Sequence, residues 1–507
     1  MSVGKRRVLV VSAVAVAAAA AVTVAATLVL RPDHSSTASA GEQAVSPTPV
    51  VTSSAPPEPA AAAALDPVLK GADASRATKP AALAGRIAGA GKSGGKVSAA
   101  VLSAQSGKLL YQDGADSALI PASTNKLLTS TTALQLLGPE HRFSTRVVST
   151  TALPAGSSAS GEGPGCGCTT RPTASATANS SQHHASSIVL VGGGDPYLAG
   201  AADSATESGQ ASLEGLASKT AKRLKKAGVS SVRLGYDASL FAGPAWNPDW
   251  PSGYADVVTR TSALWADEGR LYGAEGPRQS DPAKSAATLF AKQLSKRGVK
   301  VTRVAESEVS AKVAKDQDAQ VAAVDSLSLE RIIERLLMTS DNDATEVLLR
   351  QASLGAGGDG SISSGVATVR KTLGKLGAWV DSTHTVDGSG LARTNRVSAD
   401  QLVQVIELAV SGKHAKLSPL LTGLPVAGVE GSLHYRFNER GATAGQGLVR
   451  AKTGTLSGVH SLAGYSYTRD GELLVYAFVV NNPKNDWASL AWLDRSAAAV
   501  ATCGCRG

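Results

Sequence analysis

The fold is decided by the stretch Pro121-Ala-Ser-Thr-Asn-Lys126 and by the helical pattern that follows it to about Leu137. Proline suits the first turn of a helix, and Gly138-Pro139 marks the end. Ser123 and Lys126 are three residues apart, so they project from one face of this helix, whose N-terminus favours negative charge near the serine. A lysine that loses its proton readily can act as a base toward such a serine. Alone the pair is a weak signal, because Ser-x-x-Lys also occurs on solvated helix faces.

A second polar group, Ser340-Asp341-Asn342, lies at a break between two predicted helices. Side chains at such a break can leave the helical surface and enter a cleft. The alternative is a helix-cap cluster, and we interpret Asp341 as structural. The second helix carries Asp343 and Glu346 as a predicted capping-box pair.

A third group, Lys452-Thr453-Gly454-Thr455, lies in the first of three β-type runs, 448–456, 459–467 and 473–480, which predict an antiparallel sheet. Lys452 offers positive charge to a carboxylate and Thr453 offers a hydroxyl. Gly454 allows the backbone of a ligand to approach closely. The alternative is a glycine kink in an edge strand.

In this order, the three groups form the Ser-x-x-Lys, Ser-Asp-Asn and Lys-Thr-Gly set of penicillin-binding proteins and serine β-lactamases. The long interval between Ser123 and Ser340 leaves room for an inserted region. With that insert, the chain resembles the D-alanyl-D-alanine carboxypeptidase/endopeptidases of peptidase family S13, the class C low-molecular-mass penicillin-binding proteins. The resemblance covers about Val97 to Asn482 and includes the matching stretches Gly192–Pro196, Asp387–Leu391, Leu424–Gly428 and Gly431–Leu433.

This resemblance implies an α/β (α+β) fold, with a transpeptidase-like domain of antiparallel sheet flanked by helices and a large inserted α/β region. The discontinuous DD-peptidase domain is expected at residues 76–149 and 323–507, and the insert at 150–322. Within the insert, a Cys-containing low-complexity loop is expected at 150–187. Two small α/β subdomains should follow, because stretches 222–229 and 292–299 resemble each other.

The resemblance also implies the chemistry. Ser123 forms an acyl-enzyme with peptidoglycan stem peptides and is acylated by penicillins and other β-lactams, without a metal or cofactor. Lys126 is the base and Ser340 the proton relay. The substrate is bound by Asn342, Lys452, Thr453, Gly454, Thr455 and Ser389, and the backbone N–H groups of Ser123 and Thr455 form the oxyanion hole. The alternatives are a β-lactamase, or a non-catalytic penicillin-sensing or peptidoglycan-binding membrane protein.

The N-terminal part predicts an extracytoplasmic location. Residues 1–7, with Lys5-Arg6-Arg7, are an expected cytoplasmic n-region, and the uncharged run 8–30 would reach roughly 35 Å as a helix, enough to cross a hydrocarbon core of about 30 Å. This run is a signal anchor or, with a small-residue site at Ala38-Ser39-Ala40, a signal peptide. Residues 31–75 are an Ala/Ser/Pro-rich spacer. The protein is expected to be a single-pass membrane protein or to be secreted to the cell wall.

Charge and cysteine content bear on three further possibilities: a nucleic-acid partner, disulfides and a zinc site. The chain has 507 residues, and its net charge of +9 includes the three N-terminal cations, so the excess is too thin and scattered to indicate a nucleic-acid partner. The four cysteines form two Cys-Gly-Cys pairs, Cys166/Cys168 and Cys503/Cys505, as possible disulfides. Bonds within or between the pairs both remain open. Zinc is less favoured, because structural zinc pairs usually have two or more residues between ligands.

Overall fold

The computed structural model describes residues 77–151, 153, 186–271, 277–310, 313 and 316–505, all of which belong to one unit that spans 62–507. The expected n-region, anchor and spacer at 1–75, and Cys166 and Cys168, lie outside the described residues. Within the described part, no helix has both the length and the apolar character needed to span a bilayer.

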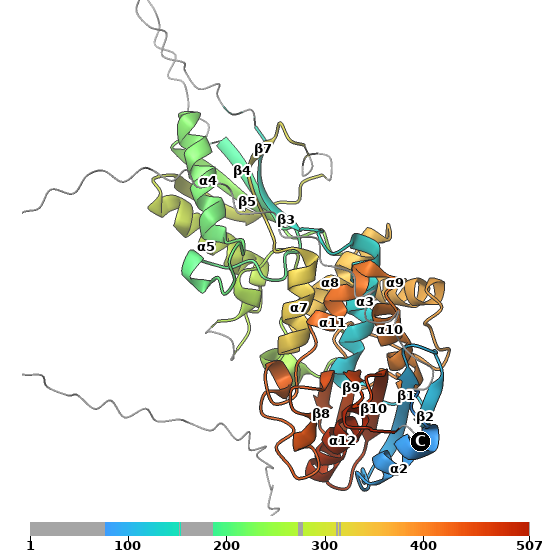
Figure 1. The fold of residues 1–507 in the computed structure, drawn as a ribbon. Helices are drawn as coiled ribbons and strands as arrows, with labels where there is room; N and C mark the ends of the chain where they lie inside the picture. Colours follow the sequence, from blue (N-terminus) through green and yellow to red (C-terminus); the bar gives the residue numbers. More distant parts are fainter. Residues whose placement is uncertain are drawn as a thin grey trace, which may run out of the picture. The chain divides into compact units, whose positions relative to one another are not determined.

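The first sheet is antiparallel and joins the two ends of the described chain (Figure 1). Its strand order is β2-β1-β10-β9-β8. β1 pairs with β10 along its whole length, from Lys96 opposite Asn481 to Ser103 opposite Leu474. The strands are β1 (Lys96–Ser103), β2 (Leu109–Asp113), β8 (Arg450–Leu456), β9 (Val459–Tyr467) and β10 (Leu473–Asn481).

β10 shows how the sequence builds layers on both faces of this sheet. Side chains alternate between the two faces of a strand. Leu474, Tyr476 and Phe478 belong to a core with α2 (Pro80–Ala88) and α12 (Asp486–Ala501), where Phe478 lies edge-on to Trp492. Val475, Ala477 and Val479 belong instead to the core of the opposite, helical layer.

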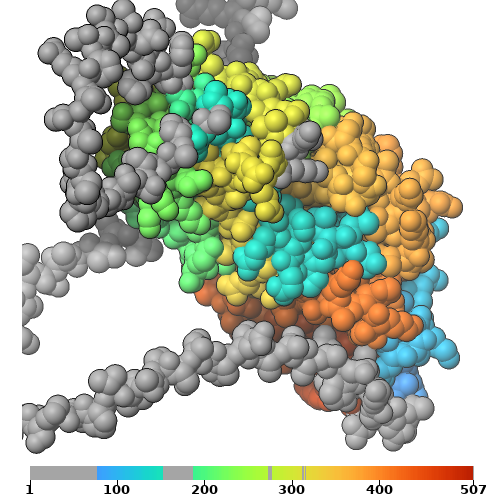
Figure 2. All heavy atoms as spheres, turned by 90° about the horizontal axis from the view of Figure 1, so that it is seen from above, coloured from blue at the N-terminus to red at the C-terminus, as the bar shows by residue number. Residues whose placement is uncertain are grey.

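The helical layer carries two of the three motifs. Its helices are α3 (Lys126–Leu137), α7 (Leu329–Thr339), α8 (Asn342–Gly355), α9 (Ile362–Lys375), α10 (Ala399–Val410) and α11 (Ser418–Thr422). α7 buries a stripe of Leu and Ile at three- and four-residue spacing, as an amphipathic helix should. α3 packs against α7 and α8. In Figure 2, the teal part of the chain, which includes α3, lies next to the yellow part, which includes α7 and α8.

The second sheet has the order β6-β5-β4-β3-β7. β4, β5 and β6 are parallel, whereas β3 is antiparallel to both β4 and β7. α4 (Leu213–Lys226) connects β4 to β5, and α5 (Pro282–Lys296) connects β5 to β6. The strands are β3 (Ser144–Ser149), β4 (Ser186–Val191), β5 (Ser231–Asp237), β6 (Lys300–Glu306) and β7 (Gln320–Asp325).

This sheet corrects the prediction of two small α/β subdomains within 150–322. The two similar stretches lie on α4 and α5, but the strands beside them pair directly, so both helices cover one common sheet and share one core. The sheet also takes in β3 and the end of β7, which the predicted boundaries placed in the DD-peptidase domain. A single βα unit buries little apolar surface alone, so pairing side by side is the more stable arrangement.

The C-terminal cysteines form a disulfide, Cys503–Cys505. Both are buried under α2 and α12, and Cys505 O accepts a hydrogen bond from Lys79 N at 3.1 Å. For this pair, the bond lies within the Cys-Gly-Cys unit.

Candidate active site

Ser123 lies on a short 3-10 helix, η2 (Ala122–Asn125), and α3 begins only at Lys126. The prediction of one continuous helix from Pro121 is therefore wrong at its first turn. Ala122 has a left-handed φ of 49°, which costs roughly 1–3 kcal/mol for a residue with a side chain. The carbonyl of Pro121 holds this conformation, because it accepts hydrogen bonds from Thr124 Oγ1 at 2.7 Å and from Ser461 Oγ at 2.6 Å.

Lys126 is completely buried beside Ser123. Its Nζ lies 2.9 Å from Ser123 Oγ, 2.7 Å from Asn342 Oδ1 and 2.9 Å from the carbonyl oxygen of Ser389. Burial lowers the pKa of Lys126 to about 8, although nearby carboxylates raise it in part. A neutral amine has two N–H donors and one lone pair. The amide and carbonyl oxygens match the donors, which leaves the lone pair for the Ser123 hydroxyl.

Ser340 ends α7 in the left-handed conformation, with φ 61°. Its hydroxyl accepts a hydrogen bond from Lys452 Nζ at 2.8 Å, and Lys452 also donates to the carbonyl of Thr453 at 2.9 Å. Burial, and then the charge of Lys126, lower the pKa of Lys452 well below its usual value. The structure thus brings two serine–lysine pairs together in one site, in which both lysines are buried and both serines are partly exposed.

Gly454 has a different neighbour from the one predicted. A Cβ at this position would collide with Ser461 Oγ and would lie 2.7 Å from Pro121 O and 3.0 Å from Ser123 N. The chain itself, at η2, makes the close approach that we predicted for a ligand. Glycine therefore lets edge strand β8 lie against the backbone of Ser123, while Thr455 beyond it is exposed.

Two other predicted residues have partners within the protein. Thr453 Oγ1 lies 2.7 Å from Ser432 Oγ, in the matching stretch Gly431–Leu433. Ser389 is fully buried, and its carbonyl oxygen accepts a hydrogen bond from Lys126. This differs from the expected contact of Ser389 with substrate.

Glu346 is a site residue that the sequence reasoning misassigned to a capping box. Its carboxylate accepts hydrogen bonds from Gly388 N at 3.1 Å and Ser389 N at 2.7 Å, and so holds the carbonyl that faces Lys126. Burial and the charge of Asp387 raise the pKa of Glu346 to about 7. The sequence could have indicated that Glu346 belongs to the site, because Glu346 lies four residues after Asn342 and therefore on the same helical face.

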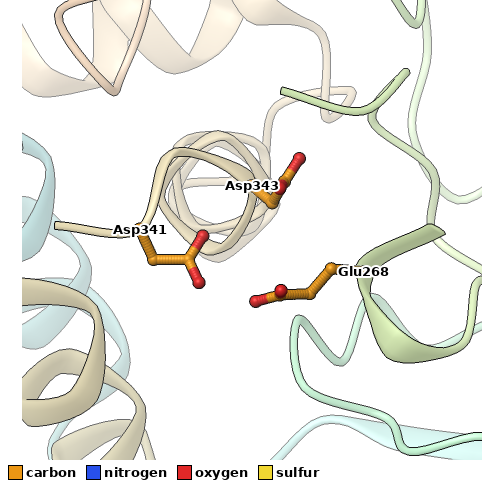
Figure 3. A group of neighbouring side chains, drawn as sticks. All are labelled: Glu268, Asp341 and Asp343. Atoms are coloured by element: carbon orange, nitrogen blue, oxygen red, sulfur yellow. The ribbon is translucent and has the colours of Figure 1, made fainter. Parts of the chain in front are cut away.

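Asp341 is the true N-cap of α8, since its side chain accepts a hydrogen bond from Ala344 N at 3.0 Å. The predicted pair Asp343 and Glu346 lies inside the helix, buried against other partners. Carboxylate oxygens of Glu268, Asp341 and Asp343 lie within 4.8 Å of one another (Figure 3). This spacing could hold a cation, but Arg270 already approaches the cluster, with a 2.5 Å bond to Glu268.

Comparison with known proteins shows which family this chain resembles. The model of the D-Ala-D-Ala carboxypeptidase 3 (S13) family matches residues 80–160, 167–273 and 273–500. "Carboxypeptidase Rv3627c" of Mycobacterium tuberculosis is 30% identical over 419 residues, which cover 81% of each chain. The D-alanyl-D-alanine carboxypeptidase of Actinomadura sp. strain R39 is 29% identical over 483 residues, covering 79% of this chain and 80% of that one.

The fold is also that of a solved structure. Penicillin binding protein 4 (dacB) of Haemophilus influenzae superimposes with a TM-score of 0.63 at 18% identity, over 82% of this chain and 97% of the other. The expected fold class, with an antiparallel sheet flanked by helices and an α/β insert, is confirmed. The chain belongs to the D-Ala-D-Ala carboxypeptidase 3 (S13) family.

Proposed function

We propose that this serine-type D-alanyl-D-alanine carboxypeptidase acts on peptidoglycan stem peptides through an acyl-enzyme on Ser123. The observation that carries the proposal is the 2.9 Å contact between Lys126 Nζ and Ser123 Oγ, in a site where Lys126 has a lowered pKa. Both a carboxypeptidase and an endopeptidase can use this chemistry, because both cut the bond after a D-alanine.

Acylation would use the two lysine–serine pairs in turn. Lys126 takes the proton of Ser123 as the hydroxyl attacks the carbonyl of the D-Ala-D-Ala amide. The N–H groups of Ser123 and Thr455 stabilise the oxyanion, a contribution of about 3 to 4 kcal/mol per donor. Ser340 relays to the leaving amine the proton that Lys126 took from Ser123, the C–N bond breaks and D-alanine departs, and water then hydrolyses the ester.

Substrate binding would use groups that have internal partners in the free protein. Lys452 and Thr453 bind the terminal carboxylate in exchange for Ser340 and Ser432. Asn342 donates from Nδ2 to Val257 O at 3.0 Å, so binding an amide of the acyl chain requires that bond to be exchanged.

β-Lactams are proposed as acylating inhibitors, because their ring amide presents the same kind of carbonyl to Ser123. A structure of the Haemophilus influenzae penicillin binding protein 4 in complex with a β-lactam superimposes on this fold with a TM-score of 0.58 at 19% identity. The complex of this protein of the same fold supports the proposal that β-lactams bind at the site of Ser123.

We also propose that the enzyme is extracytoplasmic and is held at the membrane by residues 8–30. The uncharged run 8–30 after three cations supports this, as does the Cys503–Cys505 disulfide, since disulfides persist in oxidising compartments. Mass spectrometry of the mature N-terminus tests it, because cleavage after Ala40 would leave a secreted form without an anchor.

Three reagents test the catalytic proposal: a D-Ala-D-Ala peptide, a chromogenic β-lactam and a fluorescent penicillin. Ser123→Ala should abolish both D-alanine release and penicillin labelling, whereas the control Ser106→Ala, in an exposed hairpin turn, should retain them. Fast β-lactam turnover without D-alanine release would indicate a β-lactamase instead. Stable labelling with neither turnover would indicate a penicillin sensor.

A further inference from the structure

The insert contacts three consecutive residues of the second motif and the helix that follows it. Val257 O accepts the hydrogen bond from Asn342 Nδ2, and Thr259 N donates to Asp343 Oδ1 at 2.6 Å. Carboxylate oxygens of Glu268 and Asp341 lie within 4.8 Å of each other. The side chains of Glu268 and Asp341 point toward one another in Figure 3. The loop between β5 and α5 therefore supports the start of α8 at every position from 341 to 343.

Glu268 is buried in an unusual setting, with only 7% of its surface exposed. Its Oε2 accepts a hydrogen bond from Arg270 Nε at 2.5 Å. Among the described residues, Oε1 has no hydrogen-bond partner, although it is buried. An ionised carboxylate only accepts hydrogen bonds. Two facing carboxylates therefore need either a proton or a cation between them.

The surrounding charges favour a proton. Arg270 and Arg278 lie 3.6 and 3.5 Å from Asp343 Oδ2, so two guanidinium groups meet three carboxylates. One proton on Glu268 balances the cluster, whereas a divalent cation would leave it positive. The other ionisable groups that face it are Tyr197, Arg335 and Lys126. The Tyr197 hydroxyl donates to Asp341 Oδ2 at 3.5 Å, Arg335 on α7 approaches Glu207 at 3.9 Å, and the charge of Lys126 interacts with Asp341 and Asp343.

The pKa shifts agree with this account. Burial, and then the charge of Asp341, raise the pKa of Glu268 well above its usual value. Burial is the largest influence on Asp341 and opposes its ionisation, but hydrogen bonding from Glu268 and Ala344 N and the charges of Arg270 and Arg335 together lower the pKa of Asp341. Burial and Asp341 raise the pKa of Asp343 to about 6.

The backbone around Glu268 is held in a costly conformation. Asp267, Glu268 and Gly269 form η5 (Asp267–Gly269) with φ values of 49°, 55° and 65°. Gly200 N donates to Asp267 Oδ1 at 2.9 Å, and Thr259 Oγ1 donates to Glu268 O at 2.6 Å. Such strain persists only where the surroundings over-determine it, so the side chain of Glu268 is directed firmly at Asp341.

We propose that Glu268 is a positioning residue that shares one proton with Asp341, so that the insert holds Ser340 and Asn342 in place beside the two lysines. The inference rests on the proposed catalytic roles of Ser340 and Asn342. It gives the insert a function in the reaction, although none of its side chains contacts Ser123 or Lys126 among the contacts described above.

The test compares Glu268→Gln and Glu268→Ala with the wild type and with the control Glu214→Gln. Glu214 lies on α4 of the same insert, where it binds Arg297 at 2.9 Å. Each full-length protein is assayed for the rate constant of penicillin acylation across pH and for its thermal unfolding. Gln can donate to Asp341 and accept from Arg270, so Glu268→Gln should acylate within about threefold of the wild type near neutral pH. Glu268→Ala should be slower by about 10- to 100-fold, because the motif shifts.

The pH profile separates positioning from a purely structural role. Wild-type acylation should fall at alkaline pH as the shared proton is lost, and Glu268→Gln should lack this fall, while Glu214→Gln should keep it. Acylation by Glu268→Ala at the wild-type rate, or the same alkaline fall in Glu268→Gln, would overturn the proposal. If Glu268→Ala does not fold, the profile of Glu268→Gln decides.

A cation in place of the proton is tested by the same proteins. Millimolar Ca²⁺ or Mg²⁺ should leave the melting temperature of the wild type unchanged, and a rise that is absent in Glu268→Gln would overturn the shared proton. If the wild type itself does not react with penicillin, the proposed function is wrong. If the wild type reacts but the Glu268 variants do not behave as expected, only this inference is wrong.

Discussion

The carbonyl oxygen of Ser389 accepts a hydrogen bond from Lys126 Nζ at 2.9 Å. This contact joins the catalytic helix to the turn at residues 387–391, where the sequence analysis expected Ser389 to bind substrate. A fixed carbonyl orients the amine without adding a negative charge that would strongly favour its protonated form. Burial can then lower the pKa of Lys126 to about 8.

The acylation rate should therefore rise as the pH passes about 8, before the alkaline fall that we expect from the loss of the shared proton on Glu268. Lys126 accepts a proton only when neutral, and its neutral fraction grows as the pH passes about 8. The rate constant for penicillin labelling, measured on both sides of that pH, should show an apparent pKa near this value. A profile that rises only near 10.5, the usual value for lysine, would contradict the assignment.

Stability should fall with pH because of Glu346. Its pKa is raised from 4.5 to about 7, so the folded protein keeps a proton that the unfolded chain releases. The contribution of Glu346 to the free energy of unfolding is complete below pH 4.5 and is lost as the pH rises to about 7. The free energy of unfolding should fall by about 3 kcal/mol over this range.

Glu346→Gln should remove this part of the decline, as measured by chemical denaturation across the window. The exposed Glu430→Gln variant should keep the wild-type slope. Equal slopes in all three proteins would show that folding does not change the pKa of Glu346.

Gly454→Ala should separate β8 from η2. The added Cβ meets Ser461 and the backbone at Pro121 and Ser123, so we expect a stability loss of about 1–3 kcal/mol. Displacing the backbone of Ser123 should slow penicillin acylation by about 100-fold. The matched control is Gly374→Ala on α9, where a Cβ meets nothing within 4 Å. Normal acylation by Gly454→Ala would refute the close packing.

Removing the Cys503–Cys505 disulfide should lower the free energy of unfolding by about 1–2 kcal/mol, because the loop that it closes is very short. The double variant Cys503→Ala/Cys505→Ala should still acylate at the wild-type rate, since the bond lies in the core with α2 and α12, on the other face of the sheet from α3. Cys166→Ala/Cys168→Ala is the control. Loss of acylation in the first variant alone would show coupling across the sheet.

Patterns of neighbouring residues correctly predicted those helices and strands that depend on interactions close together in the sequence. The strands of the terminal sheet and the apolar stripe of α7 follow from side-chain periodicity, and the motif order indicated the family. The failures have a common cause. The neighbours of Gly454 and the partners of Glu346 are distant in the sequence, so neither is visible in a local pattern. Likewise, two similar βα stretches do not reveal whether their strands pair with each other.

The contacts of 257–268 with 341–343 also bear on attempts to miniaturise the enzyme. A shortened chain without the insert would remove the acceptor of the Asn342 amide and the donor to Asp343 together. It would also leave the carboxylate of Asp341 without its proton-sharing partner. A compact hydrolase cannot be obtained from this one by truncation alone, because the loop that carries Ser340 would first have to be redesigned to stand by itself.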